Sequence, residues 1–191
     1  MNIHPIFVHF PIALLTLYAV LEIAIPLKIK AFRLFKWDTS PRFEKMYQLL
    51  TNPVWTSIKA FLVLVGTVLT FATLQTGEWA EEIYRSTGVN GTSQIGRLIE
   101  THSTFADFTM IVFSVLAVGY LAQILWNTYT LTLQKYTFIP AISNIILHPK
   151  VAPLLAFVGI IALTITGALG GAIARGPNTD PVVQMIYGWF F

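Results

Sequence analysis

The sequence of 191 residues contains no cysteine, and charged residues make up only 11% of it. Without cysteine the chain has no disulfide, thiolate zinc site, iron–sulfur cluster or covalently attached c-type haem. Soluble proteins carry roughly 25% charged residues, so this deficit excludes an ordinary water-soluble domain. Apolar residues reach 55% of the sequence, and a bilayer is the solvent that suits such a composition.

Long apolar runs are what the sequence has instead. A helix needs about 20 apolar residues to cross a hydrocarbon core roughly 30 Å thick. Four stretches meet this length, at residues 5–27, 53–76, 104–127 and 151–174. They lack the period-two alternation of strands, and lipid admits only helices or closed barrels. We therefore predict an all-α, integral membrane four-helix bundle that forms a single membrane domain over residues 1–191.

The charges between the apolar stretches predict the orientation of the bundle. The second connection is rich in glutamate, whereas the third carries Lys135 and Lys150 and no acid. By the positive-inside rule, the first and third connections are cytoplasmic, and the second connection and both termini lie on the outer, periplasmic side. The aromatic segment 181–191 is too short to span and is expected in the outer interface. The basic residues of the first connection and its flanks are Lys28, Lys30, Arg33, Lys36, Arg42, Lys45 and Lys59.

This orientation implies a multi-pass protein of the bacterial cytoplasmic membrane, with the lipid bilayer as its first partner. The sequence pI of about 9.2 does not indicate a nucleic-acid partner, because the basic residues flank membrane helices and set topology there.

Three of the four histidines are predicted to gather at the outer face. His4 and His9 lie at the outer end of the first helix, and His102 opens the third helix from the same side. His148 lies on the opposite side. A single histidine at a membrane boundary is often structural, but a polar group there is costly. Three at one face favour a functional site.

His9 and His102 form the most plausible ligand pair. On an ideal helix, each is followed along its own stripe by two small residues, which leave room for a planar group or for close helix packing. Two facing imidazoles are natural axial ligands for a b-type haem held without cysteine. We therefore predict one haem b near the outer face, with these two residues as its metal ligands.

His4 is expected beside this site, because a spacing of five residues turns it away from His9 on a straight helix. A three-histidine zinc or copper site would need a bent helix, so it ranks below haem. Arg97 and Arg175 are candidates for pairing with haem propionates, and are equally well explained as interfacial arginines.

Gly170 and Gly171 lie in a small-residue stretch near the outer end of the fourth helix. They are candidates for one wall of a cofactor pocket, and plain helix packing is the alternative explanation.

Two acids lie inside the predicted helices, where ionisable groups mark proton or substrate paths by default. Asp107 follows His102 by just over one turn, and we expect it to bond that histidine or to carry protons to the outer site. Glu22 lies towards the inner end of the first helix. For Glu22 we favour a structural role, either pairing with a neighbour such as Lys59 or reaching the inner interface.

The opening HPIFVHFPIALL, residues 4–15, resembles the HPxxVHFPIxLL start of domain-of-unknown-function family 2231, DUF2231. Further matches are Thr76-Gly77-Glu78-Trp79 after the second helix, His102 at the start of the third, and Gly170-Gly171 near the end of the fourth. The resemblance covers nearly the whole chain and implies a four-helix bacterial membrane domain. It brings no established activity, although fusion of some members to c-type cytochrome modules implies a redox setting.

Three functions are compatible with these patterns. The first is a b-type cytochrome-like electron-transfer protein, exchanging electrons between a quinol and an outer redox protein or acting within a larger redox complex. The second is a non-redox transporter or assembly subunit whose histidines bind a metal ion or protons. The third is a structural subunit in which the histidines cap helix ends. The short connections favour an electron-transfer component over a stand-alone enzyme.

Overall fold

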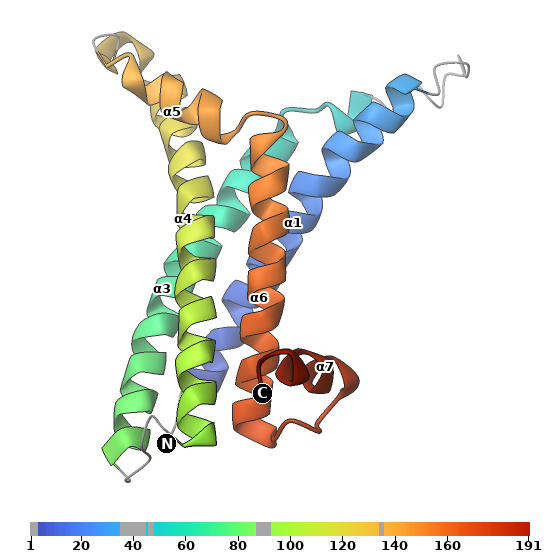
Figure 1. Ribbon diagram of the computed structural model, residues 1–191. Coiled ribbons are helices and arrows are strands. Elements are labelled where there is room, and N and C mark those ends of the chain that lie inside the picture. The colour runs from blue at the N-terminus through green and yellow to red at the C-terminus, as the bar shows by residue number, and fades with distance from the viewer. Residues whose placement is uncertain (1–3, 35–44, 46–47, 87–92, 134–135) are drawn as a thin grey trace.

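The computed structural model describes residues 4–34, 45, 48–86, 93–133 and 136–191, and this part of the chain is helical with no strand (Figure 1). Four of its helices are long and apolar enough to cross a membrane, which confirms the predicted all-α fold with four spans. The labelled helices are α1 (His4–Leu34), α3 (Val54–Ser86), α4 (Gln94–Leu133), α5 (Phe138–Ile146), α6 (Val151–Arg175) and α7 (Pro181–Phe190).

The helices extend beyond the apolar stretches that predicted them. Helix α3 continues past residue 76 to Ser86, where Arg85 pairs with Glu81 one turn earlier. Such a pair at a spacing of four residues supports a helix in water by roughly 0.2–0.5 kcal/mol. Helix α4 continues past residue 127, and its backbone leaves helical geometry at Tyr129, with φ −119° and ψ 29°.

The four long helices form a ring in which α1 packs on α3 and α6, and α4 packs on the same two helices. Helices α1 and α4 therefore occupy diagonal corners of the bundle. Helix α1 begins at the end of the bundle where α6 finishes (Figure 1). We use "outer" for this end and "inner" for the opposite end, following the predicted orientation. Of the basic residues behind that prediction, Lys36, Arg42 and Lys135 lie outside the described residues.

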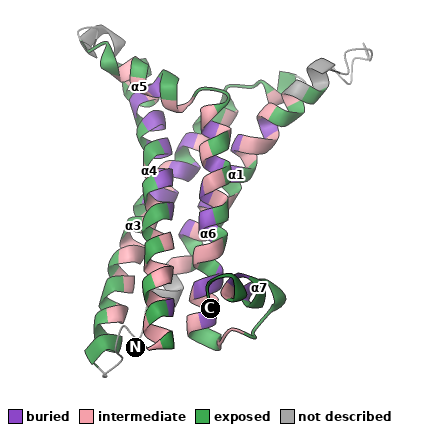
Figure 2. Cartoon of the chain, in the orientation of Figure 1, coloured by how far each residue is buried: buried purple, intermediate pink, exposed green. Residues whose placement is uncertain are grey.

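The bundle interior is a layer of large side chains without solvent exposure, among them Leu15, Tyr18 and Phe113. The Tyr18 ring meets the Phe113 ring edge to face, with centroids 6.2 Å apart. Glycine permits this close packing, since a Cβ at Gly66 would lie 2.6 Å from the Leu15 Cδ2, and one at Gly159 would lie 2.9 Å from the Phe113 Cζ. The exposed positions lie on the outward faces of the helices (Figure 2), and many of them carry large apolar side chains, as lipid contact requires.

Helix α7 is a short, largely apolar helix that packs against α6 near its outer end (Figure 1). Asp180 caps it, since its Oδ1 accepts from the backbone N–H groups of Val182 at 2.9 Å and Val183 at 3.0 Å. Val183 and Ile186 are buried, whereas Trp189 is exposed. The predicted segment 181–191 is thus a helix whose outward side is apolar, which suits the membrane interface.

Candidate functional site

A buried carboxylate lies at the centre of the most polar part of the bundle interior. Glu22 of α1 is 5% exposed. Its Oε2 lies 3.1 Å from Nζ of Lys59 on α3, and it accepts a hydrogen bond of 2.7 Å from the Tyr120 hydroxyl on α4. The expected pairing of Glu22 with Lys59 is therefore confirmed. We call Glu22, Lys59, Tyr120 and the adjacent Tyr18 the inner polar cluster.

The inner polar cluster joins three of the four spans. All its members fall within the apolar stretches predicted to cross the membrane, and the bond from Tyr120 to Glu22 links the diagonal helices α1 and α4. Burying a charged group costs several kcal/mol even after relaxation. The Lys59 ammonium and the Tyr120 hydroxyl offset this cost, because they place an opposite charge and a donor on the same oxygen.

Tyr18 lies one helical turn before Glu22 on α1 and completes the cluster. Its ring meets those of Phe113 and Tyr120 edge to face, with centroid distances of 6.2 and 6.0 Å. Within the described part of the chain, its buried hydroxyl has no hydrogen-bond partner. An unsatisfied buried hydroxyl costs about 1–3 kcal/mol, so a hydroxyl at this position needs an explanation.

A second set of polar side chains continues from the middle of the bundle towards its outer end. The Thr67 hydroxyl donates to the Phe113 carbonyl at 3.4 Å. The Thr109 and Thr166 hydroxyls lie 3.4 Å apart, and His102 Nδ1 lies 3.0 Å from the Thr166 carbonyl. We call Thr67, Thr109, Thr166 and His102 the outer polar group.

One face of α4 connects the two sets. His102, Thr109 and Tyr120 are seven and then eleven positions apart, close to two and three turns of a helix with roughly 3.6 residues per turn. Between the last two, Phe113 and Leu116 are fully buried on the same face. The interior thus carries polar groups at two levels along α4, with the buried apolar side chains of Phe113 and Leu116 between them.

The predicted haem ligands do not share one environment. His102 is half-buried and turned towards α6, whereas the His9 side chain is exposed on α1. Their helices lie at diagonal corners of the bundle. His4 begins α1, but its side chain lies outside the described part of the structure. His148 is exposed at the inner end and accepts a 3.3 Å hydrogen bond from the Lys150 backbone N–H.

The two glycines of α6 face different neighbours. A Cβ at Gly170 would lie 3.1 Å from Cε1 of His102, and one at Gly171 would lie 3.3 Å from Cγ2 of Val183. Gly170 thus lets the imidazole lie against α6, and Gly171 lets α7 pack on it. Small residues permit such close approach in membrane helices.

The charged residues expected at the outer site are exposed. Arg97 and Arg175 lie at the surface of α4 and α6. Asp107 is also exposed, because five positions carry it about 140° around the helix from His102. Among the described residues, no group of three or more histidine, aspartate or glutamate side chains could hold a metal ion.

Comparison with protein families gives a match over residues 1–177 to the family described as "Predicted membrane protein (DUF2231)". The chain belongs to DUF2231. No curated protein and no solved structure matched it. This DUF2231 chain is a multi-pass integral membrane protein, and the family description names no activity. A functional assignment for this member of DUF2231 therefore has to rest on the geometry of its polar groups.

The sequence alone did not single out Tyr18, Tyr120 or Thr166 of this DUF2231 protein. One signal was available for Tyr18, since it precedes Glu22 by four residues and shares its helix face. Tyr120 and Thr166 have no comparable signal, because their roles depend on which helices are neighbours in the bundle.

Proposed function

We propose that this DUF2231 protein moves protons across the membrane, with Glu22 as the group that binds the proton inside the bilayer. The observation that carries the proposal is the burial of this carboxylate at 5% exposure, within a predicted span and bonded to Lys59 and Tyr120. Ionisable groups at such depth are expensive and are typical of proton relays.

The inner half of the path begins at Lys59, whose side chain is 14% exposed and long enough to extend towards water at the inner interface. A proton entering there passes to the Glu22 carboxylate, which becomes a neutral carboxylic acid. The hydroxyls of Tyr120 and Tyr18 come next, and a hydroxyl can both accept and donate a hydrogen bond. One proton leaves at the outer end for each proton that enters at the inner end. Every step is a proton transfer, so no group is oxidised or reduced.

The outer half of the path is the outer polar group. Its threonine hydroxyls relay the proton to His102, whose imidazole has one ring nitrogen that can accept a proton and one that can donate it. Internal water would bridge those consecutive hydroxyls that are not in contact, as it commonly does for buried polar groups. The apolar layer of Phe113 and Leu116 would prevent a continuous water pore and so limit leakage of other ions.

A purely structural clamp between α1 and α3 is the competing explanation for Glu22, and a transport assay separates the two. Purified protein is reconstituted into liposomes that contain a pH-sensitive dye, and a potassium gradient with valinomycin drives proton entry. Wild-type vesicles are expected to acidify faster than protein-free vesicles. Glu22→Gln, which keeps the shape and an acceptor oxygen, is expected to return the rate to that of protein-free vesicles.

The matched control is Glu82→Gln, which neutralises an exposed glutamate of α3 and is expected to leave the rate unchanged. A wild-type rate no higher than that of protein-free vesicles would overturn the proposal, as would a Glu22→Gln rate equal to wild type. In either case the clamp explains the cluster.

A second candidate function is suggested by the imidazole of His102. Its Nδ1 lies 3.0 Å from a backbone carbonyl, and a bond of this kind orients many metal-bound histidines. A haem b in an electron-transfer protein, or a zinc or copper ion, is the corresponding cofactor. A quinol and an outer redox protein would be its partners.

The residues as placed do not offer a facing histidine pair, because the His9 side chain is exposed and the His102 imidazole is turned towards α6. Haem binding therefore stays a prediction, and its test is optical. A protein purified after expression with ample haem should show a reducible Soret band that His102→Ala removes. Absence of that band would refute haem binding, and elemental analysis would then decide between zinc, copper and no metal.

A further inference from the structure

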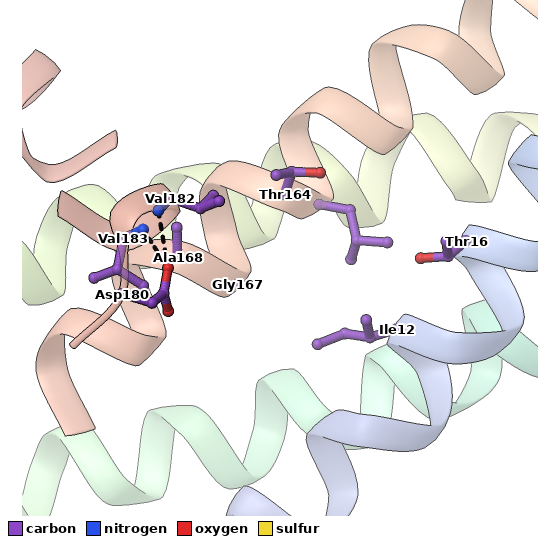
Figure 3. A pocket seen from close by; sticks show the side chains of 9 residues that line it. Ile12, Thr16, Thr164, Gly167, Ala168, Asp180, Val182 and Val183 are labelled. Atoms are coloured by element: carbon purple, nitrogen blue, oxygen red, sulfur yellow. Dashed lines mark hydrogen bonds between the residues drawn. The ribbon is translucent and has the colours of Figure 1, made fainter. Parts of the chain in front are cut away.

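A cleft of about 270 Å³ lies between α1, α6 and α7 (Figure 3). Gly170, the glycine of α6 that lies against His102, does not line this cleft. Ile12 and Thr16 of α1 face Thr164 and Gly167 of α6 across it, and Asp180 lies at its outer end beside α7 (Figure 3). We call it the outer cleft. Its full lining is Ile12, Thr16, Leu163, Thr164, Gly167, Ala168, Asp180, Val182 and Val183.

The outer cleft opens towards lipid rather than water over most of its length. Thr164 and Gly167 are exposed within the span predicted for α6, and the neighbouring Leu17 and Ile161 are exposed apolar side chains. A ligand would reach the cleft by lateral diffusion in the bilayer. The outer end of the cleft is formed by Asp180, Val182 and Val183, which follow the end of α6, and we expect this end at the level of the headgroups.

The polar atoms of the outer cleft favour a ligand that donates hydrogen bonds and carries positive charge. The Thr164 hydroxyl already donates to the Ile160 carbonyl at 2.7 Å, so its oxygen is left as an acceptor. The Asp180 carboxylate carries a negative charge, and within the described part of the chain no lysine or arginine forms a salt bridge with it. An ammonium group complements a carboxylate of this kind, whereas an anionic headgroup is repelled.

We propose that the outer cleft binds a phospholipid with a primary ammonium headgroup, of the phosphatidylethanolamine class, from the outer leaflet. Its ammonium donates to Asp180, and one acyl chain lies along Ile12, Leu163 and Val183. The cleft is slightly smaller than the roughly 300–1,000 Å³ of small-molecule sites, which suits part of one acyl chain. This site is independent of the proton path, since it shares no residue with it.

The headgroup contact is tested by native mass spectrometry of protein extracted from bilayers of defined composition. Phosphatidylcholine is the matched probe, because it keeps the zwitterionic phosphate but has no N–H donor. Wild type is expected to retain phosphatidylethanolamine about two- to fivefold over phosphatidylcholine, the range of one exposed hydrogen bond, because choline keeps the positive charge and lacks only the N–H donor. Asp180→Asn is expected to abolish that preference. The variant removes the negative charge but keeps α7 capped, because asparagine caps a helix as well as aspartate does.

The chain contact is tested by filling the cleft. A Cβ at Gly167 would meet no atom within 4 Å, so Gly167→Leu fits the fold and projects into the outer cleft. This variant is expected to lose the retained phospholipid. Gly188→Leu is the matched control, because Gly188 has equally open surroundings on α7 and does not line the cleft.

Three results would overturn the proposal. The first is equal retention of the two zwitterionic lipids by wild type, and the second is a preference for phosphatidylglycerol or for an added quinone. The third is retention by Gly167→Leu equal to that of Gly188→Leu.

Discussion

Removing the ammonium of the Glu22–Lys59 pair is the sharpest test of the interior packing. Lys59→Met keeps a long unbranched side chain but leaves the buried carboxylate with the Tyr120 hydroxyl as its partner. Breaking a buried pair costs roughly 3–5 kcal/mol. Since the Lys59 side chain is 14% exposed and the Glu22 side chain 6%, the protein does not enclose the pair completely. We therefore expect a loss of about 3 kcal/mol, at the lower end of that range.

The double variant decides whether the loss comes from the pair itself. Glu22→Gln alone leaves a lysine whose long side chain can extend to the inner interface, so its cost is expected to be smaller than that of Lys59→Met. Glu22→Gln combined with Lys59→Met leaves no charge in the interior. The double variant is expected to be more stable than Lys59→Met alone, with a non-additive cycle.

The assay is equilibrium unfolding in mixed micelles of increasing dodecyl sulfate content, followed by tertiary-structure fluorescence. Wild type, both single variants and the double variant are measured under one condition. Losses that add within about 0.5 kcal/mol, or a Lys59→Met protein as stable as wild type, would refute the account of a coupled buried pair.

Four further predictions concern the core and the topology. Tyr120→Phe is expected to cost about 1.5–3 kcal/mol, because it removes a hydrogen bond to a charged group. Tyr18→Phe is expected to stabilise the protein, by at most about 1–3 kcal/mol, because it removes a buried hydroxyl that has no partner in the described part of the chain, yet to lower proton flux in liposomes; an unchanged flux would exclude Tyr18 from the path. Gly66→Val should destabilise by about 1–3 kcal/mol through overpacking, since its Cβ would lie 2.6 Å from a leucine of α1, whereas Gly167→Ala should be neutral in the same unfolding assay. Reporter fusions at the C-terminus should be active on the periplasmic side, and activity on the cytoplasmic side would invert the predicted orientation.

Much of the fold follows from the sequence because the hydrocarbon core imposes a length. The four long apolar runs predicted four spanning helices, and all four are present. Their ends were less predictable. Helix α3 runs on to Ser86, since helical hydrogen bonding continues into water wherever local pairs support it, and a count of apolar residues cannot detect this.

Within the candidate site, the sequence predicted only the contact between side chains on two helices that are consecutive in the chain. The pairing of Glu22 with Lys59 was expected from their common level near the inner ends of consecutive helices. The bond from Tyr120 was not, because it crosses the bundle between diagonal helices. Lipid is as apolar as the bundle interior, so periodicity does not reveal that His9 faces outward while Glu22 faces inward.

Proton flux through reconstituted protein is the measurement that tests the central claim most directly. With a fixed membrane potential as the driving force, the account predicts an acidification rate that rises in proportion to the amount of wild-type protein per vesicle. It predicts no such rise for Glu22→Gln. A rate independent of the amount of wild-type protein, or an equal rise for Glu22→Gln, would contradict it.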